Sequence, residues 1–188
     1  MGGVLVDFGC GVGNLIPHVE RLCDRYVGAD IVRHSEFPRG MEFQLIDVET
    51  GRTSLDSNSV DVACGMEVMN LVENPRNLVR ELTRIIRPGG WVFISVPNNL
   101  SLLNLFTLVV RKRFQAFQDE LYPMHITAVL EVDLHRMAGE SGLDRVATTF
   151  TARGRMPYVD AVYPRIVARL APRWFSDIVV MEAHKPDV

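Results

Sequence analysis

The sequence has few cysteines, no long apolar run and little net charge, and each shortage excludes a class of protein. Its three cysteines, Cys10, Cys23 and Cys64, contain no Cys-x-x-Cys pair, and an odd number argues against a disulfide framework. We therefore expect small buried thiols in a reducing compartment. The longest apolar stretch, residues 100–110, is about half of what a membrane-spanning helix requires. No basic segment followed by an apolar core and a cleavage site opens the chain, so we expect no secretory signal.

The net charge and the length of the chain exclude further classes of protein. The net charge of −3 gives no general attraction to nucleic acid or to anionic membranes. A chain of 188 residues with 47% hydrophobic residues suits one globular domain with its own core. We expect a single cytoplasmic domain over residues 1–188, with no nucleic-acid partner and no stable membrane insertion.

Short apolar runs alternate with amphipathic stretches along the whole chain. Asn74 is a good helix N-cap, and Pro75 suits the first position of the helix that follows. This alternation predicts an α/β fold with a mostly parallel sheet covered on both faces, a three-layer sandwich. The predicted strands occupy 3–8, 25–30, 41–47, 59–65, 91–97, 146–151 and 177–184, and the predicted helices occupy 14–22, 74–86, 131–141 and 159–170.

Three glycines spaced two apart follow the first predicted strand. In a doubly wound sheet, ligands bind where the first strand turns into its helix, and bare backbone there can approach a ligand closely. Dinucleotide-binding proteins need G-x-G-x-x-G, whereas Gly9, Gly11 and Gly13 form G-x-G-x-G, with Asn14 next and Asp7 two residues before. The spacing disfavours a dinucleotide site. An NAD-dependent reductase or epimerase and a purely structural tight turn remain as alternatives.

The stretch DFGCGVG resembles the first motif of class I S-adenosylmethionine-dependent methyltransferases. VGAD ends the second predicted strand with Asp30, nineteen residues after Gly11, where these enzymes place an acid for the ribose hydroxyls. A carboxylate suits a vicinal diol because it can accept two hydrogen bonds side by side. Residues 60–98 resemble the ubiquinone-biosynthesis-type, or methyltransferase type 11, subfamily. The segment HITAVLEVDLHRMAGESGL resembles the family stretch that carries a histidine and then a helix.

This resemblance, which covers residues 4–184, implies a Rossmann-like sheet of seven strands, mostly parallel, with an antiparallel last strand. It implies methyl transfer from S-adenosylmethionine, which leaves S-adenosylhomocysteine. Several of the implied ligands also have structural explanations, because Asp7 could cap the turn and Asp30 could simply end a strand. Met66 and Glu67 could pack on the core. The implied cofactor-binding residues are Asp7, Gly9, Cys10, Gly11, Gly13, Asp30, Ile31, Asp47, Val48, Met66 and Glu67.

The sequence departs from the family in two places. Many relatives carry a Glu-His pair after the fourth strand, where this chain has Asn70 and Leu71, so no histidine base stands there. Most relatives also have helices before the first strand, whereas here the strand begins within about three residues of Met1. With these helices missing or very short, we expect either a longer natural chain or an open site that favours a weak homodimer.

Residues 98–125 are the predicted acceptor-binding region, because this fold commonly inserts a substrate cap at this position. The apolar face of this region and the basic residues 111–113 are compatible with a helix packed on the sheet, a lid over an apolar acceptor, or interfacial membrane contact. The expected acceptor is a small molecule, a glycan or a lipid-linked compound. An oxygen or nitrogen acceptor must lose a proton, and the resemblance implies His125, on the cap, as the candidate catalytic base. A purely structural histidine is the alternative. Asp119 and Glu120 make a poor metal-binding pair, so we expect no metal. A catalytically inactive S-adenosylmethionine-binding module remains the non-enzyme alternative.

Overall fold

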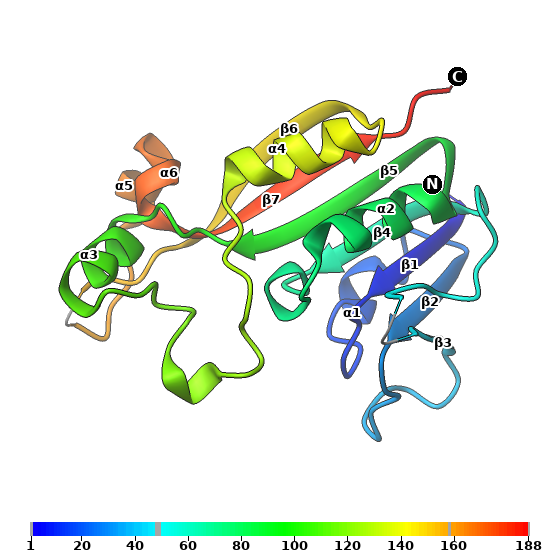
Figure 1. Cartoon of the computed structure of the whole chain (residues 1–188), viewed down its shortest axis with the longest axis horizontal. Coiled ribbons are helices and arrows are strands. Elements are labelled where there is room, and N and C mark those ends of the chain that lie inside the picture. Colours follow the sequence, from blue (N-terminus) through cyan, green and yellow to red (C-terminus); the bar gives the residue numbers. More distant parts are fainter. Residues whose placement is uncertain (1, 48–49, 158, 188) are drawn as a thin grey trace.

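The computed structural model describes residues 2–47, 50–157 and 159–187, and these residues form a twisted sheet with helices packed against it (Figure 1). The order of the strands across the sheet is β3-β2-β1-β4-β5-β7-β6. All neighbours from β3 to β5 pair in parallel, and β7 pairs antiparallel with both β5 and β6. The predicted sheet with an antiparallel last strand is therefore confirmed. The strands are β1 Val4–Phe8, β2 Arg25–Asp30, β3 Glu42–Leu45, β4 Val60–Met66, β5 Ile86–Pro97, β6 Asp144–Arg153 and β7 Ser176–His184.

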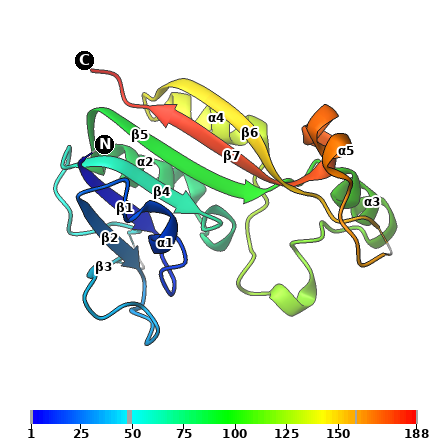
Figure 2. The ribbon, with the colours of Figure 1, turned by 180° about the vertical axis from the view of Figure 1, so that it is seen from behind.

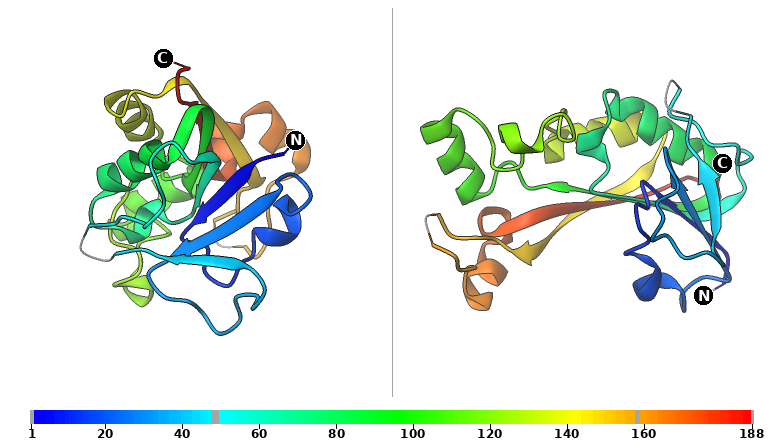
Figure 3. Two further views of the ribbon diagram at one scale, coloured as in Figure 1. Left: turned by 90° about the vertical axis from the view of Figure 1, so that its right-hand side faces the viewer. Right: turned by 90° about the horizontal axis from the view of Figure 1, so that it is seen from below.

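The helices cover the two faces of the sheet unequally. Figure 3 shows α2 and α4 along one face, while the short α1 lies on the opposite face. Helices α5 and α6 lie farther along that opposite side, beyond the centre of the sheet, as Figure 2 shows from behind. The helices are α1 Ile16–Val19, α2 Pro75–Ile85, α3 Leu102–Arg111, α4 Glu131–Glu140, α5 Arg165–Leu170 and α6 Pro172–Phe175, with 3-10 turns η1 Met69–Leu71 and η2 Asp119–Leu121.

Two predicted helices are shorter than expected. The helix predicted over 14–22 is reduced to the single turn Ile16–Val19, with Pro17 in that turn. The helix predicted over 159–170 begins only at Arg165, directly after Pro164. Apolar periodicity thus predicted both helices but not their lengths.

Helix α2 shows how the sequence determines local structure and packing together. The Asn74 side chain accepts a hydrogen bond from the Asn77 backbone N–H at 3.2 Å, and Pro75 occupies the first turn, as predicted. Val79, Leu82 and other apolar residues at helical spacing are completely buried against β4 and β5. Burial of this apolar face is the main stabilising contribution of the helix, because an isolated helix of this length is marginal in water.

The segment after β5 leaves the sheet, forms α3 and η2, and returns at α4 (Figure 1). Asn98 attaches its start to β7, since the Asn98 amide donates to the carbonyls of Arg173 and Ser176 at 2.8 and 2.9 Å. The buried Asn104 amide donates to the Asn98 carbonyl at 2.8 Å. Across the described residues, no helix is long and apolar enough to cross a membrane.

We expect Leu82→Ala to lower the free energy of unfolding by about 2–5 kcal/mol, because Leu82 has no exposed surface and its truncation leaves a cavity. Urea denaturation measures the change. The matched control is Val132→Ala on α4, whose side chain is 46% exposed and which should change stability by less than about 0.5 kcal/mol. Equal effects of the two substitutions would contradict the assignment of Leu82 to the core.

Candidate cofactor and acceptor site

The glycine loop joins β1 to α1 and is fixed to the end of β2. The Gly9 and Cys10 backbone N–H groups both donate to the Ala29 carbonyl, at 2.7 and 3.1 Å. A Cβ atom on Gly9 would lie 2.5 Å from Cγ2 of Val68, so glycine there is required by packing. Gly11 differs, because a Cβ atom added to it would meet no protein atom within 4 Å, although its φ of +52° still favours glycine. The loop therefore leaves open space at Gly11.

A cavity of about 310 Å³ lies between this loop and the end of β4. Its position outside the carboxyl ends of parallel strands is where ligands bind in open α/β sheets. Six of the eleven predicted cofactor-binding residues line it. The lining residues are Asp7, Gly9, Cys10, Gly11, Val12, Asn14, Leu15, Met66 and Glu67.

Asp30, the predicted acid at the end of β2, is hydrogen-bonded to the glycine loop that lines the cavity. The Asp30 carboxylate accepts hydrogen bonds from the Gly11 N–H at 2.8 Å and from the Ile31 N–H at 2.7 Å. The backbone of Gly13 has a φ of +87°, and a Cβ there would lie 2.7 Å from Ile16 Cδ1. Ile31 is 58% exposed. Gly13 is thus required by the conformation and packing of the loop, while Asp30 and the exposed Ile31 lie at its edge.

Asp47, another implied cofactor-binding residue, does not line the cavity. Asp47 is exposed, and its carboxylate accepts hydrogen bonds from the Thr50 N–H and hydroxyl, at 2.8 and 2.9 Å. Val48, the neighbouring predicted residue, lies outside the described residues. The structure therefore brings the β1 and β4 candidates together but leaves Asp47 engaged in its own turn.

Asp7 is the most deeply buried acid of the cavity, with 3% of its surface exposed. Burial raises the pKa of this carboxyl to about 6, although the hydrogen bond from the Tyr26 hydroxyl, at 2.7 Å, acts in the opposite direction. Burial also raises the pKa of the Cys10 and Cys64 thiols to about 12. These two cysteines are free and buried, as expected, whereas the third free cysteine, Cys23, is only half-buried.

Glu67 adopts a backbone conformation that is uncommon for a residue with a side chain. Its φ is +56°, in the left-handed region, and its N–H donates to the Ser95 carbonyl and hydroxyl oxygens at 3.2 and 2.9 Å. The Ser95 hydroxyl in turn donates to the Glu67 carboxylate at 2.9 Å. Burial raises the pKa of Glu67, while Ser95 and the charge of His125 lower it. Such strain clusters at functional sites.

His125 lies in the segment between β5 and α4, half-buried beside the ring of Phe117. Its Nδ1 is 2.6 Å from the Ala116 carbonyl oxygen. Because a carbonyl can only accept, Nδ1 must carry the proton, which leaves the lone pair of the neutral ring on Nε2. His125 does not line the 310 Å³ cavity, but it lies within electrostatic reach of Glu67.

Sequence reasoning missed the role of Asn70 in positioning this histidine. The Asn70 carbonyl accepts the backbone N–H groups of Ile126 and Thr127, at 2.9 and 3.2 Å, and thereby ties the His125 segment to the end of β4. Its side chain is 1% exposed and has no hydrogen-bond partner among the described residues. No motif marks this contact, because it depends on backbone groups.

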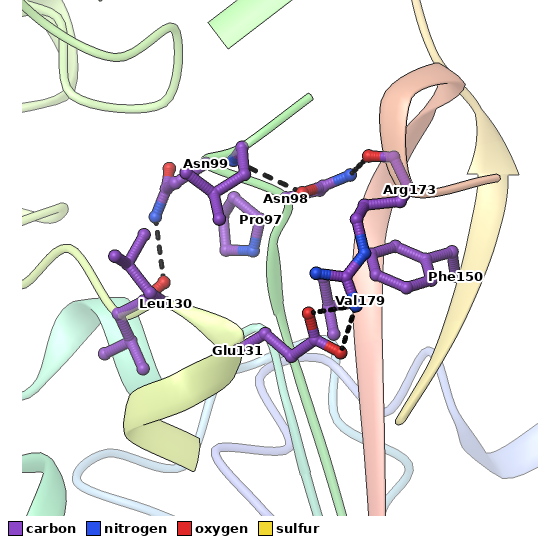
Figure 4. A pocket seen from close by; sticks show the side chains of 10 residues that line it. Pro97, Asn98, Asn99, Leu130, Glu131, Phe150, Arg173 and Val179 are labelled. Atoms are coloured by element: carbon purple, nitrogen blue, oxygen red, sulfur yellow. Dashed lines mark hydrogen bonds and ion pairs between the residues drawn. The ribbon is translucent and has the colours of Figure 1, made fainter. Parts of the chain in front are cut away.

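A second cavity, of about 10 Å³, lies where β5 ends and α4 begins (Figure 4). Arg173 extends across it, with its guanidinium 3.0 Å from the Glu131 carboxylate and 5.4 Å from the centre of the Phe150 ring. This volume suffices for about one water molecule. The contacts around it therefore attach α6 to α4 and to the sheet rather than bind a cofactor.

The described residues contain no group of three or more His, Cys, Asp or Glu side chains arranged to hold a metal ion. The site instead combines a glycine loop after β1 with an acid at the end of β2. On this sheet, that combination defines a Rossmann-like protein that binds a nucleotide-type cofactor.

The chain belongs to the methyltransferase domain family, whose model matches residues 2–148. Membership decides against the NAD-dependent reductase or epimerase alternative. The chain is 24% identical over 143 residues to the ubiquinone biosynthesis O-methyltransferase of Thiobacillus denitrificans, covering 76% of this chain and 61% of that protein. It is 31% identical over 108 residues to the enzyme of the same name from Albidiferax ferrireducens, covering 52% of this chain and 42% of the relative. The chain thus spans only about half the length of these curated relatives.

Solved structures share the fold. The possible histamine N-methyltransferase of Thermotoga maritima has a TM-score of 0.70 and 17% identity, covering 97% of this chain and 82% of its own. An S-adenosylmethionine-dependent methyltransferase from Archaeoglobus fulgidus has a TM-score of 0.69 and 17% identity, covering 97% and 86%. These likenesses confirm the Rossmann-like methyltransferase fold.

We expect the buried Asp7 to make stability fall as the pH rises. Because its pKa in the folded protein is about 6, against 3.8 for the ordinary group, the folded state binds more protons between about pH 4 and 6. The free energy of unfolding therefore decreases through this window, by up to about 3 kcal/mol from this group. Asp7→Asn should remove the decrease and be more stable than the wild type at pH 7.

Urea denaturation at a series of pH values measures this difference. The control is Glu36→Gln, an exposed acid outside the cavity, which should leave the pH dependence unchanged. An Asp7→Asn protein whose stability follows the wild-type curve at every pH would contradict the assignment.

Proposed function

We propose that this chain carries the catalytic domain of a methyltransferase that transfers a methyl group from S-adenosylmethionine to a hydroxyl oxygen of a small-molecule acceptor. The observation that carries the proposal is the 310 Å³ cavity between the glycine loop and Glu67, with His125 nearby. Family membership supports the reaction class. The curated relatives, named O-methyltransferases of ubiquinone biosynthesis, support oxygen as the acceptor atom.

The residues that line the cavity suit S-adenosylmethionine in chemistry and charge. Gly11 offers backbone without a side chain, so a ligand can approach the loop closely. Asp7 and Glu67 place carboxyl groups in the walls, which suits a ligand with an ammonium group and a sulfonium. Asp30 uses two of its lone pairs on Gly11 and Ile31 and keeps others for ribose hydroxyls. When bound, the cofactor supplies a methyl group already activated by the positive sulfur.

The protein must then align the acceptor, exclude water and remove the hydroxyl proton. His125 fits the last role because the Ala116 carbonyl holds the proton on Nδ1 and leaves Nε2 as an acceptor. Glu67 lies within electrostatic reach of His125. Ser95 orients the Glu67 carboxylate through one oxygen. His125 is therefore the proposed base.

Residues 98–125, in the segment between β5 and α4, are the proposed cap over the acceptor. The segment carries His125 and is tied to η1 by the backbone bonds to Asn70. Its mixture of apolar and polar side chains suits an aromatic alcohol. Glycan and lipid-linked acceptors remain the competing classes, and a panel of acceptors distinguishes them from a phenolic one.

Gly11→Val should abolish binding of S-adenosylhomocysteine while leaving the protein folded, since the branched side chain would enter the open space beside the loop. Isothermal titration calorimetry measures binding, and circular dichroism checks the fold. The matched control is Gly40→Val, because an added Cβ there also meets no atom, and Gly40 lies outside the cavity. Undiminished binding by a folded Gly11→Val protein would show that the loop is only structural.

His125→Ala should lower kcat by about 10²–10⁴-fold while leaving the affinity for S-adenosylhomocysteine unchanged, because a base acts on the acceptor and not on the cofactor. The assay follows transfer of a labelled methyl group to catechol, a simple phenolic acceptor. The control is His18→Ala, since His18 is exposed on α1. Equal turnover by the His125 variant would remove this residue from catalysis. Cofactor binding without turnover of catechol would contradict the phenolic acceptor and leave the cofactor assignment intact.

A further inference from the structure

One end of the molecule, away from the β1–β3 half of the sheet, concentrates exposed apolar side chains. It is formed by residues 102–113, which contain α3, and residues 159–175, which contain α5 and α6; we call it the distal face. Figures 1 and 2 show these helices together at the same end of the longest axis, and Figure 3 shows them flanking the end of the sheet from its two sides. Both segments can therefore touch one flat surface.

The distal face is unusually apolar for exposed protein surface. Nine of the eighteen large apolar side chains that are exposed among the described residues belong to it, although it comprises 29 of the 188 residues. Val109, Ile166 and Leu170 are 70%, 68% and 80% exposed. Single exposed apolar residues are normal, but a concentration of this kind marks an interaction site.

The same face is strongly basic in an acidic chain. It holds six basic residues and one acidic residue, a net charge of +5, whereas the whole chain has −3. Arg113 and Arg173 are paired with carboxylates. The other four cations, Arg111, Lys112, Arg165 and Arg169, have no ion-pair partner among the described residues.

The spacing of the apolar and the basic side chains in α5 indicates which kind of partner this face would bind. Ile166 and Leu170 are four residues apart and lie on one side of the helix, and Arg165 and Arg169 repeat the same spacing beside them. Aliphatic side chains bordered by long cations fit an anionic lipid surface, because the aliphatic groups enter the acyl boundary while the cations reach the headgroups. Trp174, 48% exposed, adds an aromatic side chain of the type found at such interfaces.

We propose that the distal face docks the protein onto the surface of an anionic phospholipid membrane. The protein lies on the bilayer and does not span it. This inference is independent of the proposed reaction, because it uses no residue of the cavity and none of the candidate catalytic residues.

Flotation of the full chain with phosphatidylcholine vesicles, with and without phosphatidylglycerol, tests the proposal. We expect binding to the anionic vesicles that weakens as salt is added, and little binding to phosphatidylcholine alone. Arg165→Glu with Arg169→Glu should weaken binding roughly tenfold or more. Ile166→Ser with Leu170→Ser should also weaken it, which pure charge attraction would not predict. A blue shift of tryptophan fluorescence that Trp174→Phe removes would place α6 at the lipid.

The matched controls are Arg21→Glu with Arg39→Glu, and Leu22→Ser, all exposed and outside the distal face; they should bind like the wild type. Thermal denaturation confirms that each variant is folded. Equal affinity for neutral and anionic vesicles would overturn the proposal, as would equal losses in the control variants. Self-association that the distal-face variants abolish, without vesicle binding, would assign the face to a second copy of the chain. Binding of RNA in place of vesicles would also contradict the lipid assignment.

Discussion

The carbonyl group of Ala29, at the end of β2, holds the glycine loop in place, and the site depends on that attachment. It accepts two backbone N–H groups of the loop, so the turn after β1 cannot move without breaking both bonds. Gly9 is consequently pressed against Val68, which begins the turn after β4. The ends of three neighbouring strands are thus coupled. The same turn carries Asn70, whose carbonyl fixes the segment of His125, so cofactor and acceptor regions share one anchor.

The sequence predicted the parallel sheet, the glycine loop and the start of α2, because these depend on local patterns such as apolar runs, glycine spacing and an N-cap. It overestimated the length of α1 and of α5, and α5 begins only after Pro164. It could not predict the backbone conformation of Glu67 or the bonds to Asn70, since both arise from packing between segments distant in the sequence. The resemblance implies Asp47 as a cofactor ligand, and this stays a prediction; in the structure its carboxylate accepts hydrogen bonds from Thr50 in its own loop.

Two acids that line the cavity, Asp7 and Glu67, have features that lower the stability of the folded protein. Asp7 is held at 3% exposure with a raised pKa, and Glu67 combines burial with a left-handed backbone. Each feature costs free energy, because a buried carboxylate has lost its water and a left-handed φ is unfavourable for a residue with a side chain. Hydrogen bonds offset part of the cost, since Tyr26 donates to Asp7 and Ser95 donates to Glu67. Under the proposed function, a cationic ligand would offset more of it.

Acidic and basic side chains gather in different parts of the molecule, the acids in the cavity and the cations on the distal face. The walls of the cavity carry carboxyl groups, whereas the distal face carries four cations that have no ion-pair partner among the described residues, together with aliphatic side chains. The segment between β5 and α4 connects the two regions, because it contains both α3, which belongs to the distal face, and His125, the proposed base. Docking through α3 would therefore hold one part of this segment at the bilayer surface.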